Sequence, residues 1–245
     1  GEYALWYNNI FISTGQGSSN TIAYSYNGIN WIGLGSSIFS TSGNGIISNN
    51  SLVISVGQGS TNTIAYSING ISWTGLGSTI FSSSGNYIIW DSTKFIAVGS
   101  GTNTLAYSYN GTLWIGNGST IFSTSGNCIS WNSSSQYVAV GQGTNSIAYS
   151  SNGISWTGLG TTIIAIGYGV YFNDLTWVVT GSGTNSICYS SDGLTWTGVT
   201  STNIFSTQGN FVYGNNLKSG KVSIQHPFIS LGAGSDNTLA YSLNG

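Results

Sequence analysis

Charge is nearly missing from this sequence. Of its 245 residues, three are Lys or Arg and five are Asp or Glu, which gives a formal net charge of −2 at pH 7. Binding to DNA or RNA requires basic side chains that neutralise phosphates, so the composition predicts no nucleic-acid partner. The sequence also lacks an apolar run long enough to cross a bilayer as a helix, and we expect no membrane insertion.

Reactive side chains are scarce as well, and arginine is absent. A carboxylate pair for glycoside cleavage would require two distant acids to meet in the fold. A zinc site would need the single His, the two Cys and acids from separate segments. The sequence therefore predicts no catalytic residue, no metal site and no cofactor. The acidic residues are Glu2, Asp91, Asp174, Asp192 and Asp236.

The few remaining reactive groups have simpler interpretations. His226 lies beside Pro227 in an insertion around residues 217–228, which also holds Lys218 and Lys221, and we interpret it as an exposed loop residue. The two cysteines fall at non-equivalent points of the repeat described below. We predict that they are buried free thiols rather than a disulfide, and they are Cys128 and Cys188.

What the sequence does contain is a repeated octapeptide. Tyr149 to Trp156 reads Tyr-Ser-Ser-Asn-Gly-Ile-Ser-Trp, and a cut-off copy runs from Tyr241 to Gly245. The Trp residues follow one another after 42, 41, 42 and 40 residues. A fixed period of this length indicates one structural unit repeated along the chain. The copies end at Trp31, Trp73, Trp114, Trp156 and Trp196.

Each repeat reads as four short strands. In every copy, Asn-Gly or Asp-Gly separates two runs of apolar-polar alternation, which is a strong hairpin signal because both turn residues of the favoured type take positive φ. In the second repeat the expected strands are 45–48, 52–56, 63–67 and 71–75. Four antiparallel strands per period of about 40 residues are typical of a β-propeller blade.

We therefore predict an all-β fold, a six-bladed β-propeller of four-stranded antiparallel blades whose last blade lacks its outer strand. It forms a single domain over residues 1–245, and seven blades are the alternative if the natural chain continues. The expected blades are approximately 1–42, 43–84, 85–125, 126–166, 167–208 and 209–245.

The octapeptide resembles the Asp-box, or BNR, repeat of sialidase-like β-propellers, Ser-x-Asp-x-Gly-x-x-Trp. Here the turn is one residue shorter, and Asn replaces Asp everywhere except at Asp192. The resemblance implies the propeller fold and a structural role for the motif. It does not imply sialidase activity, because the arginine cluster which that activity needs is missing. The matching residues are Ser25, Asn27, Gly28, Trp31, Ser67, Asn69, Gly70, Trp73, Ser108, Asn110, Gly111, Trp114, Ser150, Asn152, Gly153, Trp156, Ser190, Asp192, Gly193 and Trp196.

The amino-acid sequence of the repeats, such as Gly-Thr-Asn-Ser-Ile-Ala-Tyr-Ser, also resembles that of low-complexity repeat proteins encoded by large DNA viruses of protists. That resemblance implies a virion-surface or extracellular location. The expected partners are then other protein subunits of a surface or capsid assembly.

Uncharged amides recur where loops and blade-to-blade links meet on one face of a propeller. With aromatic side chains nearby, they suit neutral glycans, but the same residues are common turn formers and strand caps, and the two interpretations have about equal weight. The candidate ligand-binding residues are Gln16, Gln58, Gln142, Asn20, Asn62, Asn103, Asn145, Asn185, Asn44, Asn86, Asn127 and Asn210.

Two functions follow, and neither is enzymatic. The favoured one is a structural or surface interaction module, because a surface with few like charges does not resist association. The alternative is a lectin-like module that binds glycans at several equivalent sites for attachment.

Overall fold

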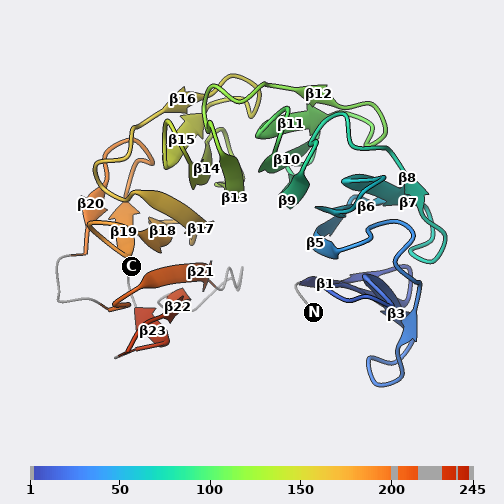
Figure 1. Cartoon of the computed structure of the whole chain (residues 1–245). Coiled ribbons are helices and arrows are strands. Elements are labelled where there is room, and N and C mark those ends of the chain that lie inside the picture. Colours follow the sequence, from blue (N-terminus) through green and yellow to red (C-terminus); the bar gives the residue numbers. More distant parts are fainter. Residues whose placement is uncertain (1–2, 200–203, 215–227, 236, 243–245) are drawn as a thin grey trace. The chain divides into compact units, whose positions relative to one another are not determined.

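The computed structural model describes residues 3–199, 204–214, 228–235 and 237–242. Its regular elements are 23 β-strands, and the described residues contain no helix, so none that is long and apolar enough to cross a membrane (Figure 1). This confirms the all-β prediction. The insertion with its two lysines and His226 lies outside the described residues, as do Glu2, Asp236 and the final Asn244-Gly245 pair.

The chain divides into two compact units, Gly1–Ser119 (unit 1) and Thr120–Gly245 (unit 2), which we describe separately. Unit 1 contains three sets of four strands, and we call each such set a blade. Its strands are β1 (Tyr3–Tyr7), β2 (Ile10–Thr14), β3 (Ile22–Ser25), β4 (Ile32–Gly33), β5 (Ser42–Ser48), β6 (Val53–Gln58), β7 (Ile64–Ser67), β8 (Thr74–Gly75), β9 (Ser84–Trp90), β10 (Phe95–Ser100), β11 (Leu105–Ser108) and β12 (Ile115–Gly116).

Unit 2 repeats the pattern, and its last blade has three strands among the described residues. Its strands are β13 (Ser125–Trp131), β14 (Tyr137–Gln142), β15 (Ile147–Ser150), β16 (Thr157–Gly158), β17 (Ile166–Phe172), β18 (Trp177–Ser182), β19 (Ile187–Ser190), β20 (Thr197–Gly198), β21 (Gln208–Gly214), β22 (Phe228–Ala233) and β23 (Leu239–Ser242).

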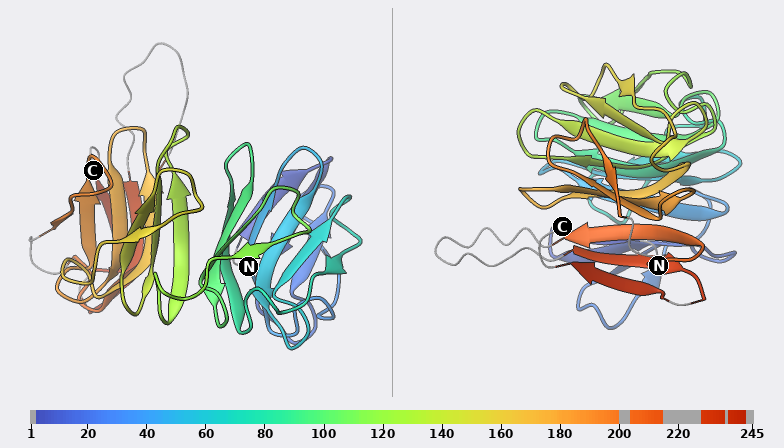
Figure 2. Two further views of the ribbon diagram at one scale, coloured as in Figure 1. Left: turned by 90° about the horizontal axis from the view of Figure 1, so that it is seen from above. Right: turned by 90° about the vertical axis from the view of Figure 1, so that its left-hand side faces the viewer.

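Within a blade each strand pairs antiparallel with the next one along the chain, and Figure 2 shows this arrangement from two further directions. Inside a unit, the first strands of successive blades touch, as β1, β5 and β9 do in unit 1 (Figure 1). The described strands group into five sheets. Six separate sheets, one for each predicted blade, are therefore not confirmed.

The second strand of a blade forms the centre of its core. Strands β6, β10, β14 and β18 each have five consecutive buried residues, because they are covered on both faces. Strand β22 differs, since its buried residues alternate with exposed ones such as Ile229 and Leu231. One face of the last blade is therefore open among the described residues.

The predicted turn and fourth strand need correction. In the second repeat only Gly70 of the Asn-Gly pair takes positive φ, at 77°, and the fourth strand is two residues long rather than five. The Asn69 side chain accepts hydrogen bonds from the backbone amides of Ile71 and Ser72, at 2.9 and 2.8 Å. These amides are therefore used locally, and the ladder with β7 begins only after Trp73.

Candidate functional site

The repeated octapeptide folds into a turn held by its own side chains. In the second repeat the Ser67 hydroxyl accepts hydrogen bonds from the amides of Asn69 and Gly70, at 3.3 and 2.8 Å. The Trp73 indole donates to the Gly70 carbonyl at 3.2 Å. Serine and asparagine suit this task because their short side chains reach backbone groups two or three residues away. The motif residues are thus brought together, and their polar atoms are used within the turn.

The other copies of the turn repeat most of these bonds. In the third copy the Ser108 hydroxyl accepts from the Gly111 amide and donates to the Leu113 carbonyl. At Trp156 the indole N–H is buried without a hydrogen-bond partner among the described residues. At Asp192 a carboxylate replaces the amide and accepts from the amides of Thr195 and Leu194, both at 2.8 Å. Hydrogen bonds from Thr195, Leu194 and Ser190 lower the pKa of Asp192 to about 2. A carboxyl with this pKa is ionised near neutral pH and cannot serve there as a general acid.

The side chains of the loop asparagines predicted to bind ligands join parts of the backbone. The Asn62 side chain accepts a hydrogen bond from the Gly77 amide at 3.0 Å and donates to the Ile38 carbonyl at 3.2 Å. A side chain at Gly75 would collide with the Asn62 amide group, which explains the glycine in each Trp-x-Gly segment. We call this arrangement the asparagine bridge. Asn103 and Asn145 make both equivalent hydrogen bonds, Asn20 accepts the one from Gly35, and Asn185 donates the one to Ile163.

Sequence reasoning missed this role, although a signal was present. Each bridging asparagine precedes its glycine by 13 residues, as Asn20 precedes Gly33 and Asn185 precedes Gly198. A constant spacing between an amide and a residue without a side chain indicates close packing of the two positions. The side chain of Asn62, whose residue is 8% exposed, thus uses both its amino group and its oxygen in hydrogen bonds to the backbone.

The four asparagines predicted on the inner rim lie at β-bulges in the first strands. The register shifts between Gly43 and Gly45, which leaves Asn44 as the extra residue, and its amide donates to the Gly85 carbonyl of the next first strand at 3.0 Å. Asn127 donates in the same way to the Gly167 carbonyl at 2.8 Å. These side chains connect neighbouring blades. The other two bulge residues are Asn86 and Asn210.

The predicted glutamines are different, because no hydrogen bond joins their side chains to the described residues. Gln16 and Gln58 are exposed and Gln142 is half-buried. Their backbones are ordered: Gln16 forms an isolated bridge with Ser42, and the Gln58 carbonyl accepts from Thr41 at 3.0 Å. Among the described residues, these three glutamine side chains therefore keep free amide groups.

The described acids and thiols do not form a reactive group. Asp91 is 3% exposed and makes an ion pair with Lys94 at 2.6 Å. Both cysteines are buried and free, as predicted, and burial raises the pKa of Cys128 to about 11 and of Cys188 to about 12. Among the described residues, no three His, Cys, Asp or Glu side chains gather as metal ligands.

Two exposed aromatic groups were not foreseen from the sequence. In the first blade Tyr24 and Tyr26 meet edge to face at 5.5 Å, and Ile32 of β4 pairs with Tyr24. In the third blade Tyr107 and Tyr109 meet at 5.8 Å, with Ile115 of β12 opposite Tyr107. The exposed fractions are 64% for Tyr26, 49% for Ile32, 61% for Tyr109 and 52% for Ile115. We call these two groups the tyrosine clusters.

The sequence matches no known protein-family profile and no curated protein. Solved structures share its fold. The GH74 enzyme of Niastella koreensis superposes with a TM-score of 0.66 at 21% identity, over 99% of this chain and 36% of that one. The GH74 xyloglucanase of Xanthomonas campestris gives 0.64 at 12% identity, over 95% and 35%. A structure of the nidogen/laminin complex gives 0.59 at 10% identity, over 91% and 89%.

These likenesses concern the fold. Together with the repeated four-stranded blades, they show a β-propeller architecture. The chain spans about a third of the length of the two GH74 enzymes.

Proposed function

We propose that the protein is a non-enzymatic surface interaction module that packs against other protein subunits through unit 1. In this proposal the six strand sets are six propeller blades, and their turns are variants of the Asp-box. The observation that carries it is the pair of tyrosine clusters, which expose apolar surface at equivalent places of the first and third blades. Exposed apolar surface of this kind is typical of docking sites.

The charge balance supports association. With eight charged residues in 245, the molecule has few like charges to repel a partner. At the same turn position the three copies in unit 2 have Ser151, Ser191 and Leu243, where the first and third copies in unit 1 have Tyr26 and Tyr109. The two tyrosines at this position are the reason for proposing the interface on unit 1. The resemblance of the repeats to viral repeat proteins suggests that the partner subunits belong to a virion-surface or extracellular assembly.

Absence of catalysis is part of the proposal. Glycoside hydrolysis requires one carboxyl that is protonated and a second that is ionised beside it. The Asp91 carboxylate forms an ion pair with Lys94. The pKa of Asp192 is too low for it to act as a general acid near neutral pH. We therefore expect no release of reducing sugar from xyloglucan.

Sedimentation equilibrium tests the interaction surface. We expect the 245-residue chain to self-associate as its concentration rises, and the double variant Tyr26→Ser, Tyr109→Ser to associate at least about tenfold more weakly. The matched control is Ser151→Ala with Ser191→Ala, which changes the same turn positions in unit 2. A wild-type chain that stays monomeric at high concentration contradicts the proposal.

A lectin-like function is the second candidate, and the tyrosine clusters favour it too. A tyrosine ring offers an apolar body with a polar tip, which matches the mixed surface of a neutral sugar. A glycan array that includes xyloglucan oligosaccharides tests it. Binding that is lost in the double tyrosine variant would favour the lectin, and no binding by the folded chain would remove it.

A further inference from the structure

Asparagine followed by glycine occurs at the same place in four copies of the repeated turn. Asparagine is a thermolabile residue, and glycine after it makes it more reactive, because a residue without a Cβ leaves its own backbone nitrogen free to approach the asparagine side chain. Asn69 and Asn152 are exposed, so water reaches both of them. The four pairs are Asn27-Gly28, Asn69-Gly70, Asn110-Gly111 and Asn152-Gly153.

The reaction open to such a pair is deamidation. The backbone nitrogen of the glycine loses its proton and attacks the asparagine Cγ, and the Nδ2 nitrogen takes up a proton and leaves as ammonia. Water then opens the resulting cyclic imide. The product is aspartate when water attacks Cγ, and isoaspartate when it attacks the backbone carbonyl carbon. Asparagine and water thus give a carboxylic acid and ammonia, with no oxidant or reductant.

The fold keeps the nucleophile of this reaction occupied. The Gly70 N–H donates to the Ser67 hydroxyl at 2.8 Å, and the Gly153 N–H donates to Ser150 at 2.9 Å. A nitrogen whose proton is held in a hydrogen bond loses it less readily, because the bond favours the protonated form. The same bond is made by Gly28 and Gly111, both at 2.9 Å.

The side chain that would be attacked is held as well. The Asn69 Oδ1 atom accepts from the amides of Ile71 and Ser72 at 2.9 and 2.8 Å. The Ser67 hydroxyl donates to the same oxygen at 3.2 Å. Rotating the amide group toward the Gly70 nitrogen would break these bonds. The reaction therefore needs a local opening of the turn.

We propose that the Asn-Gly pairs of the turns are deamidation sites, and that the motif serine suppresses the reaction with water by holding the glycine N–H. The fifth copy shows that the turn accommodates one product, because Asp192 accepts from the Leu194 and Thr195 amides as the asparagines accept from theirs. Isoaspartate lengthens the main chain before the glycine and would move its N–H away from the serine. This inference does not rest on the proposed function, because it uses neither tyrosine cluster.

The consequence for the molecule is a change of charge. Each event turns a neutral amide into a carboxylate and adds one negative charge to a chain whose net charge is −2. Turns that open often would therefore be recorded as acidic forms of the protein, which isoelectric focusing separates.

The rate of deamidation at Asn69 tests the proposal. Wild type and Ser67→Ala are incubated in alkaline buffer and digested with chymotrypsin, and the fragments are quantified by mass spectrometry. We expect Ser67→Ala to deamidate about fivefold faster or more at Asn69, because a hydrogen bond of ordinary strength no longer holds the nitrogen. Asn152 begins the same sequence, Asn-Gly-Ile-Ser-Trp-Thr-Gly-Leu, and is the internal control, which should react at the wild-type rate in the same sample.

A second variant separates this effect from a general loss of stability. Asn62→Ala removes the asparagine bridge of the same blade without touching the Gly70 N–H, and it should leave the rate at Asn69 unchanged. Equal acceleration by Asn62→Ala, or a folded Ser67→Ala variant that reacts at the wild-type rate, overturns the proposal.

The free heptapeptide of residues 67–73 keeps the test decisive if Ser67→Ala does not fold. Its asparagine has the same neighbours but no stable turn, so the folded wild-type chain should deamidate at Asn69 at least about tenfold more slowly. Equal rates in the peptide and in the folded chain would overturn the proposal.

Discussion

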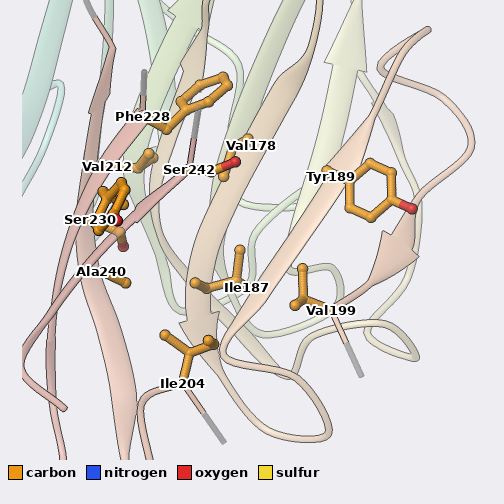
Figure 3. A pocket seen from close by; sticks show the side chains of 11 residues that line it. Val178, Ile187, Tyr189, Val199, Ile204, Val212, Phe228, Ser230, Ala240 and Ser242 are labelled. Atoms are coloured by element: carbon orange, nitrogen blue, oxygen red, sulfur yellow. The ribbon is translucent and has the colours of Figure 1, made fainter. Parts of the chain in front are cut away.

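The interface between the first two blades of unit 1 and that between the last two blades of unit 2 use the same repeat positions but are closed differently. In unit 1, Trp73 and Ile71 pack against the apolar cluster and line a smaller space of about 130 Å³. In unit 2 the corresponding interface opens into a cavity of about 170 Å³, which Ile187 and Ala240 line (Figure 3). The segment after the Asn-Gly pair therefore adds apolar contacts to the unit 1 interface that the unit 2 interface lacks among the described residues.

The largest effect is expected from removing the indole in unit 1. Trp73→Ala should reproduce the open interface there and lower the free energy of unfolding by about 3 kcal/mol, the low end for tryptophan truncation because Trp73 is only partly buried. Urea denaturation followed by circular dichroism measures it. Trp31→Ala is the matched control, because Trp31 is 43% exposed, and its cost should be under about 1 kcal/mol. Equal costs for the two variants would contradict the comparison.

Breaking the asparagine bridge should cost less. Asn62→Ala leaves the Gly77 amide and the Ile38 carbonyl without their partner, which we expect to lower the free energy of unfolding by about 2 kcal/mol. In Gly75→Ala the added methyl group would collide with the Asn62 amide group, so this variant should also lower the free energy of unfolding. Gln58→Ala serves as the control, since its side chain makes no hydrogen bond with the described residues. A neutral Asn62→Ala would show that the bridge does not hold the loop.

These bridges also show where sequence reasoning succeeded and where it did not. The period of the tryptophans and the alternation around each Asn-Gly pair predicted the strands, because both depend on local chemistry. The partner of Asn62 could not be inferred in the same way, since Ile38 belongs to the preceding blade and is brought near only by folding. The tyrosine clusters were missed for a related reason, because exposure depends on what the neighbouring blade covers.

One substitution should have opposite effects at the two interfaces. Ala240→Leu partly fills the cavity of unit 2 and should raise the free energy of unfolding by about 1 kcal/mol. Ala65→Leu, at the equivalent position closed by Trp73, should lower it by about 1–3 kcal/mol through overpacking. Thermal denaturation of the two variants and of the wild-type protein shows whether each substitution raises or lowers stability. Destabilisation by both would mean that the unit 2 cavity has no room for the added atoms.

The smallest effect concerns the one acidic copy of the turn. The pKa of Asp192 is about 2, below the roughly 3.9 of an unfolded aspartate. Its contribution to stability is therefore present above pH 4 and is lost as the pH falls toward 2. Asp192→Asn should remove this acid dependence and change little at pH 7, because Asn69 makes the same bonds. Urea denaturation between pH 2 and 7 compares the two proteins, and identical acid profiles would contradict the assignment.

The central claim is that the repeated asparagines hold neighbouring backbone segments together, and we expect from this that they do not bind a sugar. Side-chain amide hydrogen exchange, followed by ¹⁵N NMR in the presence and absence of xyloglucan oligosaccharides, tests it most directly. The amides of Asn62, Asn103 and Asn145 should exchange slowly and keep their chemical shifts when sugar is added, while that of Gln58 exchanges freely. Rapid exchange of the three asparagine amides, or shifts in them on adding sugar, would contradict the claim.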